Sequence, residues 1–476
     1  MLDELCASFI NGRFAPANGP ARELINPADE RSFHAVSDGT AREVNAAAEG
    51  AAGAWESGWR DLTPGDRSEL IHRLANLIEA NAPQLAEFDS RSMGKPLAAA
   101  RGEVLMGART FRYYAGALLM PHGDTIPVAR GGFDFTLRQP LGVIACIVPW
   151  NFPFAIACWK IAPALAAGNS VLLKPASFSP LGALVLGKLA IEAGLPAGAL
   201  QIICSRGSEV GDLMITHPLV RKVSFTGSTD VGRHVMELAA RDFTRVSLEL
   251  GGKSANVVFA DADLSKAAES APGAVFDNTG QDCCARSRIL VERPAYEEFL
   301  ERFIEATRKL RVGDPADEAT DLGPLVSRAQ RESVERFITD ARTSGRVIAY
   351  GGDRPRAPGY YLNPTIITGA KTGDRCWREE IFGPVACVRP FDDESELIRE
   401  VNDSPYGLSG SIWTRDISRA LRVARRIESG VLSINCHNSV HVEAPFGGFK
   451  HSGMGRDLGL AALDACTELK NIYISP

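Results

Sequence analysis

The sequence predicts an α/β protein with two doubly wound parallel sheets and a small additional β element. From residue 141 onward, short and almost continuously apolar runs such as 143–148 alternate with segments of helical periodicity, which is the pattern of βαβ units. A second alternating block follows Gly251-Gly252. The chain has 476 residues, more than one hydrophobic core usually serves, so two or three domains are expected.

The first part of the chain precedes this alternation. Residues 1 to about 35 contain short extended runs and turns, and the alanine-rich segment 41–55 is expected to form a helix. Apolar side chains at helical spacing predict one longer helix over 64–88. Gly94-Lys95-Pro96 ends that helix, and a further helix then reaches residue 114.

Each block has its own set of expected strands and helices. In the first block the strands are 143–148, 170–173, 200–203, 222–225 and 246–250, separated by helices at 159–166, 181–193, 208–215 and 230–240. In the second block, strands 256–259 and 289–291 alternate with helices 264–277 and 296–310, and further units continue to residue 434. Strands this apolar are expected to be buried on both faces, and doubly wound sheets bind ligands at the carboxyl ends of their strands.

Two segments outside the blocks are expected to form the additional β element. The runs 124–128 and 133–138 flank Arg130-Gly131-Gly132 and predict a hairpin, and 467–474 is a lone strand. Both are candidates for bridging subunits. Because no flexible linker separates the blocks near residue 251, we expect two closely packed domains with a cleft between them. The expected division is 1–122 with 140–250, then 251–446, with 123–139 and 467–476 as the bridging element.

Composition restricts the functional class. The net charge is -6, with both signs spread along the chain, which argues against a nucleic-acid or anionic-membrane surface as a main partner. The 10 cysteines are scattered without Cys-x-x-Cys or zinc-type spacing, so we expect no metal site. No apolar run reaches the roughly 18 residues of a membrane span, and the acidic residues 1–5 do not begin a signal peptide. A reducing cytoplasm with free thiols is the expected location.

The segment Gly280–Arg288 leads from two adjacent cysteines, Cys283 and Cys284, into an expected strand. A thiol on a loop before a strand is held rigidly and can face a cleft, and its thiolate is a nucleophile. Arg286 and Arg288 are expected to lower the thiol pKa if their charges lie close. The alternative is that the cysteines are small buried apolar residues selected for packing.

Polar residues also mark the ends of the first-block strands. Gly227-Ser228, in a turn that opens a helix, suits either a phosphate or a plain β-to-α turn. Lys174 can reach a ribose or a phosphate, or can be a solvated lysine. Asn151, held between two prolines, can donate to an oxyanion or serve as a turn residue. Glu249 lies in an apolar strand, where burial raises a carboxyl pKa toward that of a general base unless the group forms a structural ion pair.

Seven short motifs, which follow one another along the chain, include Cys283 and the polar residues discussed above. They are Pro-Trp-Asn-Phe-Pro (149–153), Leu-Lys-Pro-Ala (173–176), Phe-Thr-Gly-Ser (225–228), Leu-Glu-Leu-Gly-Gly-Lys (248–253), Gly-Gln-x-Cys (280–283), Glu-Glu-Ile-Phe-Gly-Pro (379–384) and Pro-Phe-Gly-Gly-x-Lys-x-Ser-Gly (445–453). With them the chain closely resembles the aldehyde dehydrogenase superfamily of NAD(P)-dependent enzymes over almost its whole length. The resemblance implies that 1–122 with 140–250 is a Rossmann-like NAD(P)-binding domain and 251–446 a catalytic domain. It also implies that the β element is an oligomerisation element of a homodimer or homotetramer.

The resemblance further implies a role for each site residue. Cys283 is the nucleophile, Asn151 with the backbone N–H of Cys283 forms the oxyanion hole, and Glu249 activates the water that hydrolyses a thioester. The residues implied in NAD(P) binding are Trp150, Lys174, Ser177, Gly227, Ser228, Glu380 and Phe382. The residues implied in the channel for the aldehyde substrate are Tyr113, Phe152, Trp159, Asp282, Cys284 and Phe446.

Two departures from the family pattern bear on specificity. Ser177 stands where many NAD-preferring relatives carry a glutamate, so NADP use stays open, with NAD expected ahead. Asp282 precedes the nucleophile, where an anion favours a cationic substrate, as in relatives that oxidise aminoaldehydes such as 4-aminobutyraldehyde. Its alternative role is to pair with Arg286 or Arg288. The alternative functions are a semialdehyde dehydrogenase using NADP, a CoA-acylating aldehyde dehydrogenase and a catalytically silent NAD-binding protein.

Overall fold

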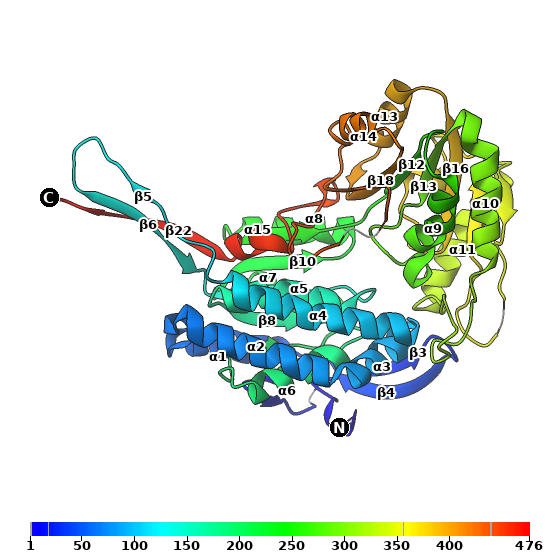
Figure 1. The fold of residues 1–476 in the computed structure, drawn as a ribbon. Helices are drawn as coiled ribbons and strands as arrows, with labels where there is room; N and C mark the ends of the chain where they lie inside the picture. Colours follow the sequence, from blue (N-terminus) through cyan, green and yellow to red (C-terminus); the bar gives the residue numbers. More distant parts are fainter. Residues whose placement is uncertain (1, 18, 356, 438–439) are drawn as a thin grey trace.

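Two large sheets, each parallel at its centre, organise the chain (Figure 1). The computed structural model describes residues 2–17, 19–355, 357–437 and 440–476. In spatial order the first sheet consists of β2 (Arg13–Phe14), β1 (Phe9–Ile10), β9 (Leu200–Ile202), β8 (Ser170–Lys174), β7 (Val143–Ile147), β10 (Val220–Thr226), β11 (Arg245–Glu249) and β21 (Gly453–Met454). The strands from β9 to β11 are parallel, whereas β1 and β21 pair antiparallel at their sides.

Helices cover both faces of the first sheet. Ile144 and Cys146 of β7 face a core formed with α5 (Pro153–Ala166) and α6 (Leu181–Glu192), whereas Val143 and Ala145 face the opposite core. That second core contains α1 (Ala41–Glu56), α7 (Glu209–Ile215) and α8 (Thr229–Ala240). Alternate side chains of one strand are thus buried on opposite faces, which explains the continuous apolar run in the sequence.

The second sheet has the same doubly wound plan. In spatial order it consists of β14 (Val347–Tyr350), β15 (Thr365–Thr368), β16 (Val385–Phe391), β13 (Arg288–Glu292), β12 (Ala255–Val258), β18 (Ser409–Trp413) and β19 (Val431–Ile434), and only β14 is antiparallel. One face packs against α9 (Leu264–Phe276) and α10 (Tyr296–Arg308). The other packs against α11 (Arg328–Thr343), α13 (Glu394–Asn402) and α14 (Ile417–Ala424). The predicted fold class is confirmed.

The expectation of one helix over 64–88 is wrong. The structure has two helices, α2 (Pro64–Ala80) and α3 (Ala82–Met93), which meet at Asn81, and α4 (Leu97–Ala117) follows them. Pro83 lies in the first turn of α3, where its missing N–H is harmless, but inside a continuous helix its ring would clash with the preceding turn. The side chain of Asn81 donates to the carbonyl of Leu77 and so caps the end of α2.

Helix α5 begins at Pro153, earlier than the expected start at residue 159. Proline is well suited to a first helical turn because its φ is preset and its missing N–H would have no intrahelical partner there. The Pro-Trp-Asn-Phe-Pro motif therefore carries the chain directly from β7 into a helix. After the second sheet the chain also returns to the first, where Gly453 of β21 pairs with Glu249 of β11.

A three-stranded sheet projects from the body of the molecule (Figure 1). It contains β5 (Thr125–Ile126), β6 (Phe133–Pro140) and β22 (Thr467–Ile474). The expected hairpin is present between β5 and β6, and β22 pairs with β6 from Thr467 opposite Pro140 to Ile474 opposite Phe133. Apolar side chains are exposed on this sheet, namely those of Ile126, Phe133, Leu137, Leu469, Tyr473 and Ile474.

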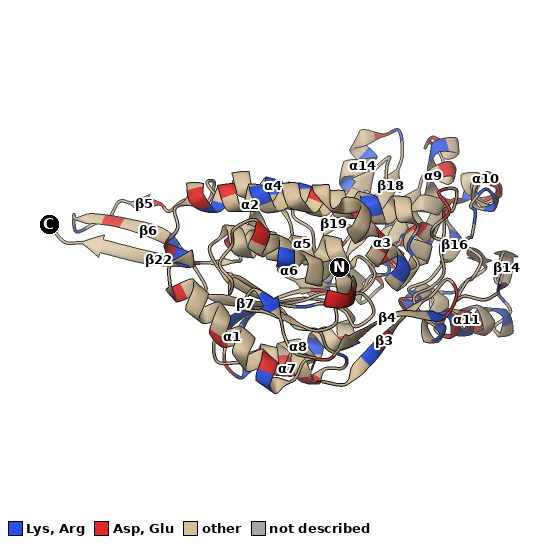
Figure 2. Ribbon diagram, turned by 90° about the horizontal axis from the view of Figure 1, so that it is seen from below, with Lys and Arg blue, Asp and Glu red and all other residues tan. Residues whose placement is uncertain are grey.

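Charged residues of both signs are interspersed along the surface helices (Figure 2). This agrees with the small net charge of -6. Along the described residues, no helix is both long and apolar enough to cross a lipid bilayer.

Candidate active site

The candidate site lies where the carboxyl edge of the first sheet meets the amino edge of the second. Trp150 and Asn151 follow β7, Gly227 follows β10, and Glu249 is the last residue of β11. From the other side, Cys283 and Glu380 precede β13 and β16. The first sheet therefore uses its strand ends as doubly wound sheets usually do, whereas the second contributes through the loops that enter its strands.

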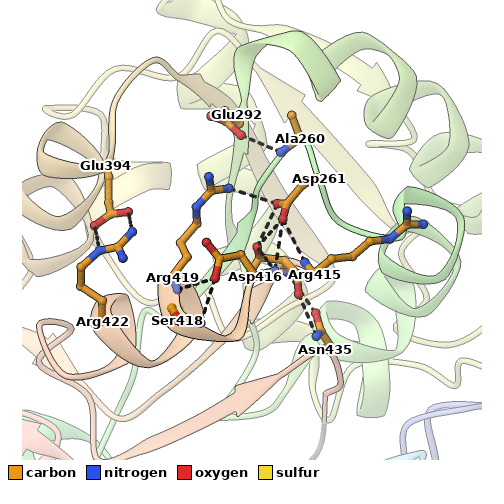
Figure 3. A network of polar contacts seen from close by, with 11 residues as sticks. Ala260, Asp261, Glu292, Glu394, Arg415, Asp416, Ser418, Arg419, Arg422 and Asn435 are labelled. Atoms are coloured by element: carbon orange, nitrogen blue, oxygen red, sulfur yellow. Dashed lines mark hydrogen bonds and ion pairs between the residues drawn. The ribbon is translucent and has the colours of Figure 1, made fainter.

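The carboxyl edge of the second sheet is occupied by its own polar network (Figure 3). Asp261, just after β12, accepts hydrogen bonds from the Thr414 hydroxyl and from the guanidinium of Arg419. It also accepts the backbone N–H groups of Arg415 and Asp416, while Asn435 holds the backbone of Thr414. The donors saturate the Asp261 carboxylate, so it stabilises the turns at this edge.

A left-handed turn places the Cys283 loop. Asn278, Thr279 and Gly280 have φ values of 51°, 57° and 68°. This conformation is costly for the β-branched Thr279, whose hydroxyl donates to the carbonyl of Gly323 at 2.9 Å. At Gly280 a Cβ atom would collide with the backbone carbonyl of Gly383. Only glycine therefore lets the loop approach the segment before β16 this closely.

The arginines were expected to lower the Cys283 pKa if their charges lay close, and this condition is not met. A hydrogen bond with the Cys284 thiol, followed by burial, raises the pKa of the Cys283 thiol well above its ordinary value. Arg288 instead donates to the backbone carbonyls of Lys253 and Val401. Arg286 donates to the carbonyl of Cys284. Both guanidinium groups thus form hydrogen bonds with backbone carbonyls. The negative charges of Asp282 and Glu380 add to the rise in the Cys283 thiol pKa.

Asn151 is buried and lies beside the cysteine loop. Its side-chain Nδ2 donates to the carbonyl of Gln281 at 3.0 Å. An amide nitrogen carries two hydrogens, so the second remains available to a group in the cavity that Asn151 and Cys283 both line. An oxyanion donor needs an N–H that is not already used in this way.

Glu249 has a buried carboxyl group whose oxygens accept no hydrogen bond from the described residues. Burial, and then the charge of Asp457, raises the pKa of Glu249 well above its ordinary value, and Lys160 opposes this rise. Asp457 pairs with Lys160 at 2.8 Å. Within the described part of the chain no ion pair neutralises Glu249 directly, which removes the structural alternative for this residue and leaves a carboxylate able to accept a proton.

Two cavities meet at Cys283. One, of about 270 Å³, is lined by residues from the ends of β7, β10 and β11 and from the segment before β16. The other, of about 230 Å³, is lined by α4, α5 and the cysteine loop. Thr226, Leu250 and Cys283 line both. The two cavities are therefore neighbours that share Cys283 in their walls.

The first cavity contains most of the residues implied in NAD(P) binding. Trp150, Gly227, Ser228, Glu380 and Phe382 line it. Trp150 and Phe382 pack edge to face with ring centroids 5.3 Å apart. Gln330 of α11, which the sequence analysis missed, also lines this cavity and donates to the carbonyl of Phe382. Nothing in the local sequence of that amphipathic helix distinguishes this glutamine.

The donor set of this cavity fits a dinucleotide. Ser228 caps α8 by accepting the N–H of Val231, so the other N–H groups of the first turn are open to an anion. Glu380 accepts the N–H of Gly252, and burial raises the pKa of its carboxyl to about 7. A Cβ at Gly251 would collide with that carboxylate. Such a carboxylate suits ribose hydroxyls, which donate hydrogen bonds.

Lys174 and Ser177 do not line either of the two cavities. Lys174 ends β8 and donates to the carbonyl of Ser205. The carbonyl of Ser177 accepts a hydrogen bond from buried Arg22. Their implied contacts with the far ribose of the cofactor stay predictions.

The second cavity contains most of the residues implied in the substrate channel. Phe152, Trp159, Asp282, Cys284 and Phe446 line it, and Trp159 and Phe446 pack with ring centroids 5.4 Å apart. Tyr113 does not line it, because its ring packs against Tyr114. Its place in the channel stays a prediction. The lining also contains residues that the sequence analysis did not place there, among them Glu103, Met106, Asp277 and Arg286.

Asp282 faces this cavity without an arginine partner. Its carboxylate accepts the N–H of Cys284 at 2.9 Å and forms no ion pair with Arg286 or Arg288. Burial raises the pKa of Asp282. Arg286 is itself buried, and its Nε has no hydrogen-bond partner among the described residues. The second cavity therefore presents both an anionic and a cationic group near the nucleophile.

Comparison with known proteins identifies the family of this chain. The model of the aldehyde dehydrogenase family matches residues 14–472. The chain belongs to the aldehyde dehydrogenase family. Among curated aldehyde dehydrogenases, it is 40% identical over 467 residues to one from Emericella nidulans, covering 98% of this chain and 94% of that one.

Two further relatives have named substrates. The phenylacetaldehyde dehydrogenase of Pseudomonas fluorescens is 43% identical over 479 residues, with 98% of this chain and 95% of that one covered. A solved structure of a P. syringae indole-3-acetaldehyde dehydrogenase mutant, in complex with NAD+ and IAA, is similar with a TM-score of 0.97 and 41% identity. It covers 99% of this chain and 96% of that one.

The turn at Gly280 generates the first testable prediction. We expect Gly280→Ala to lower the rate of aldehyde-dependent NAD(P)H formation roughly a hundredfold, because the new Cβ displaces the nucleophile loop. Gly273→Ala is the matched control, because a Cβ there meets nothing within 4 Å and lies on α9. Initial rates measured at 340 nm test both variants, and wild-type activity in Gly280→Ala would contradict the proposed role of the turn.

Proposed function

We propose that this aldehyde dehydrogenase oxidises an aldehyde to a carboxylate with NAD or NADP, through a thiohemiacetal and a thioester on Cys283. The observation that carries the proposal is the position of Cys283, which lines both cavities at once. The thiol can therefore bond an aldehyde carbon held in the second cavity while the first holds the nicotinamide. The bound nicotinamide would supply the hydride acceptor, which no side chain can replace.

The chain's own residues account for the remaining steps. The Cys283 thiol first gives up its proton to water, and attack of the resulting thiolate converts the aldehyde oxygen to an oxyanion, which accepts from Asn151 Nδ2 and from the backbone N–H of Cys283. Loss of hydride re-forms the carbonyl as a thioester. Glu249 then removes a proton from water, the water attacks the thioester carbon, and the carboxylate leaves as the C–S bond breaks. The presence of Glu249 favours water over CoA as the acyl acceptor.

The channel residues support a cationic aldehyde as the substrate. Asp277 and Asp282 line the second cavity, and Asp282 has no arginine partner there. An ammonium at the far end of a short aliphatic aldehyde, as in 4-aminobutyraldehyde, is attracted by these carboxylates. Phe152, Trp159 and Phe446 enclose the carbon chain. We propose an aminoaldehyde as the first candidate.

A second candidate is an arylacetaldehyde. The aromatic wall of Trp159 and Phe446 suits an aromatic ring, and the two relatives with named substrates act on phenylacetaldehyde and indole-3-acetaldehyde. The unpartnered Nε of Arg286 favours instead a semialdehyde that carries a carboxylate. For the cofactor, Ser177 supplies no carboxylate to repel the 2′-phosphate of NADP, so we propose that NADP is accepted. We propose NAD first, because a similar solved structure is a complex with NAD+.

The projecting sheet supports a homo-oligomer. Its exposed apolar side chains, among them Phe133, Leu469 and Ile474, have no partner within the described chain that covers them. A second copy of the chain can bury this surface, and we propose a homodimer or a homotetramer on that ground.

The nucleophile is tested by substitution. We expect Cys283→Ala to abolish aldehyde-dependent NAD(P)H formation, because no other thiol lines both cavities. Cofactor binding, measured by isothermal titration calorimetry, should persist because the first cavity keeps its other residues. Cys6→Ala, at a half-buried thiol near the N-terminus, is the control and should retain activity. NAD(P)H formation that survives in Cys283→Ala would refute the assignment.

The proposed role of Glu249 as general base predicts that turnover depends on pH. Glu249 must be ionised to accept a proton, and its pKa is raised by burial and by Asp457. Steady-state turnover should therefore fall as the pH is lowered through a pKa above the ordinary value of about 4.3 for glutamate. Glu249→Gln should remove this limb and slow thioester hydrolysis by at least about a hundredfold, while the initial burst of NAD(P)H persists. An unchanged pH profile in Glu249→Gln would exclude this base.

Substrate preference is tested at Asp282. Asp282→Asn keeps an oxygen for the Cys284 N–H but removes the charge. We expect the ratio of kcat/KM for 4-aminobutyraldehyde to that for butyraldehyde to fall about tenfold. Phenylacetaldehyde and succinate semialdehyde complete the panel, each measured with NAD and with NADP. A ratio that does not respond to the substitution would argue against the aminoaldehyde, and a clear preference for phenylacetaldehyde would favour the second candidate.

A further inference from the structure

The backbone carbonyl of Asn151 is held by two side chains from distant parts of the chain. Nζ of Lys95 donates to it at 2.9 Å, and Nδ2 of Asn278 donates to it at 3.0 Å. Lys95 lies in the turn between α3 and α4, and Asn278 lies in the left-handed turn before the nucleophile. Neither residue lines either of the two cavities. Both can therefore affect the reaction only through the residues that they contact.

Burial of the Lys95 ammonium beside the carbonyl of Asn151 is energetically unfavourable unless the surrounding groups compensate for it. The Lys95 side chain is 1% exposed, and an ammonium group is buried only at a large desolvation cost. Glu103 forms an ion pair with it, and the ring of Phe152 lies 3.9 Å from Nζ. Gly94 and Pro96 shape the turn around it; a Cβ at Gly94 would collide with Pro324. The surroundings thus fix the ammonium at the carbonyl of Asn151.

Asn278 connects the same carbonyl to the nucleophile loop. Its Nδ2 also donates to the carbonyl of Gln281 at 3.2 Å, which is the acceptor of the Asn151 side chain. Gln281 returns a hydrogen bond from Nε2 to the carbonyl of Asn278 at 3.0 Å. A closed ring of hydrogen bonds therefore joins Asn151, Asn278 and Gln281. Lys95 adds one further hydrogen bond to this ring, at the carbonyl of Asn151.

We propose that Lys95 and Asn278 are positioning residues for the oxyanion hole. They hold the backbone of Asn151 so that one hydrogen of its side-chain amide stays on Gln281 and the other points toward the developing oxyanion. The second oxyanion donor, the N–H of Cys283, belongs to the loop that Asn278 holds, so the same ring sets the distance between the two donors. This proposal rests on the proposed function of Asn151.

A double-mutant cycle tests the proposal. The rate of hydride transfer in a single turnover is measured by stopped flow for wild type, Lys95→Met, Asn151→Ala and the double variant. Lys95→Met should slow this step roughly ten- to hundredfold through misplacement of the amide. In the Asn151→Ala background the same substitution should change the rate by less than about twofold, because the group it positions is gone. Additive losses in the double variant would overturn the proposal.

Alkylation of Cys283 by iodoacetamide separates positioning from general damage. This reaction displaces iodide at a saturated carbon and forms no oxyanion, so its rate should be the same in Lys95→Met as in wild type. A fall in alkylation that matches the fall in hydride transfer would overturn the proposal. Lys222→Met is the matched control, since Lys222 is 4% exposed and its Nζ donates to the carbonyl of Ala465 rather than to that of Asn151.

Asn278→Asp provides a second cycle should Lys95→Met not fold. The carboxylate has the same shape and tolerates a positive φ, but it cannot donate to Asn151 or Gln281. The same loss of hydride transfer and the same non-additivity with Asn151→Ala are expected, and additivity would again refute positioning. If wild type shows no aldehyde-dependent NAD(P)H formation, the proposed function fails. If wild type is active and Asn151→Ala is slow while both positioning variants are normal, only the present proposal fails.

Discussion

The hydrogen bond from Asn151 to the carbonyl of Gln281 joins the two halves of the candidate site beside Cys283. One partner comes from the first sheet and the other from the loop that enters the second. Groups that act together in catalysis must hold their relative positions within a fraction of an ångström. The boundary between the sheets therefore has to be as well packed as a core, and one apolar cluster does extend across it, from Phe154 to Cys284, Leu408 and Phe446.

The two sheets contribute different chemistry because they meet through opposite edges. The carboxyl edge of the first sheet supplies Asn151, Gly227 and Glu249, which suits binding and proton transfer. The amino edge of the second sheet supplies the loop of Cys283 and the segment of Glu380. Its carboxyl edge, where a ligand would ordinarily be sought, is saturated by the hydrogen bonds around Asp261 (Figure 3). A sheet of the same type thus serves as a support for reactive loops.

Local pattern predicted the elements well and their long-range contacts poorly. Apolar runs located the parallel strands because burial on both faces leaves a signal within a few residues. The division at Asn81 escaped this approach because the apolar periodicity continues through Pro83. Whether the arginines lower the Cys283 pKa could not be decided from the sequence, because nearness in sequence does not set where the guanidinium of Arg288 points. Gln330 gave no signal at all, since only the folded chain brings α11 to Phe382. The motifs identified the residues around Cys283, and the tertiary structure alone showed that two cavities meet there.

The pairing of β6 with β22 has a consequence for how the molecule is assembled. Arg138 and Thr467, which are joined by a hydrogen bond in this sheet, lie 329 residues apart. Closing so long a loop costs entropy that only the intervening folded structure can offset. The projecting sheet is therefore complete only in a chain whose two large sheets have already formed. If subunits associate through this sheet, only chains that have completed folding can associate, and partly folded chains cannot.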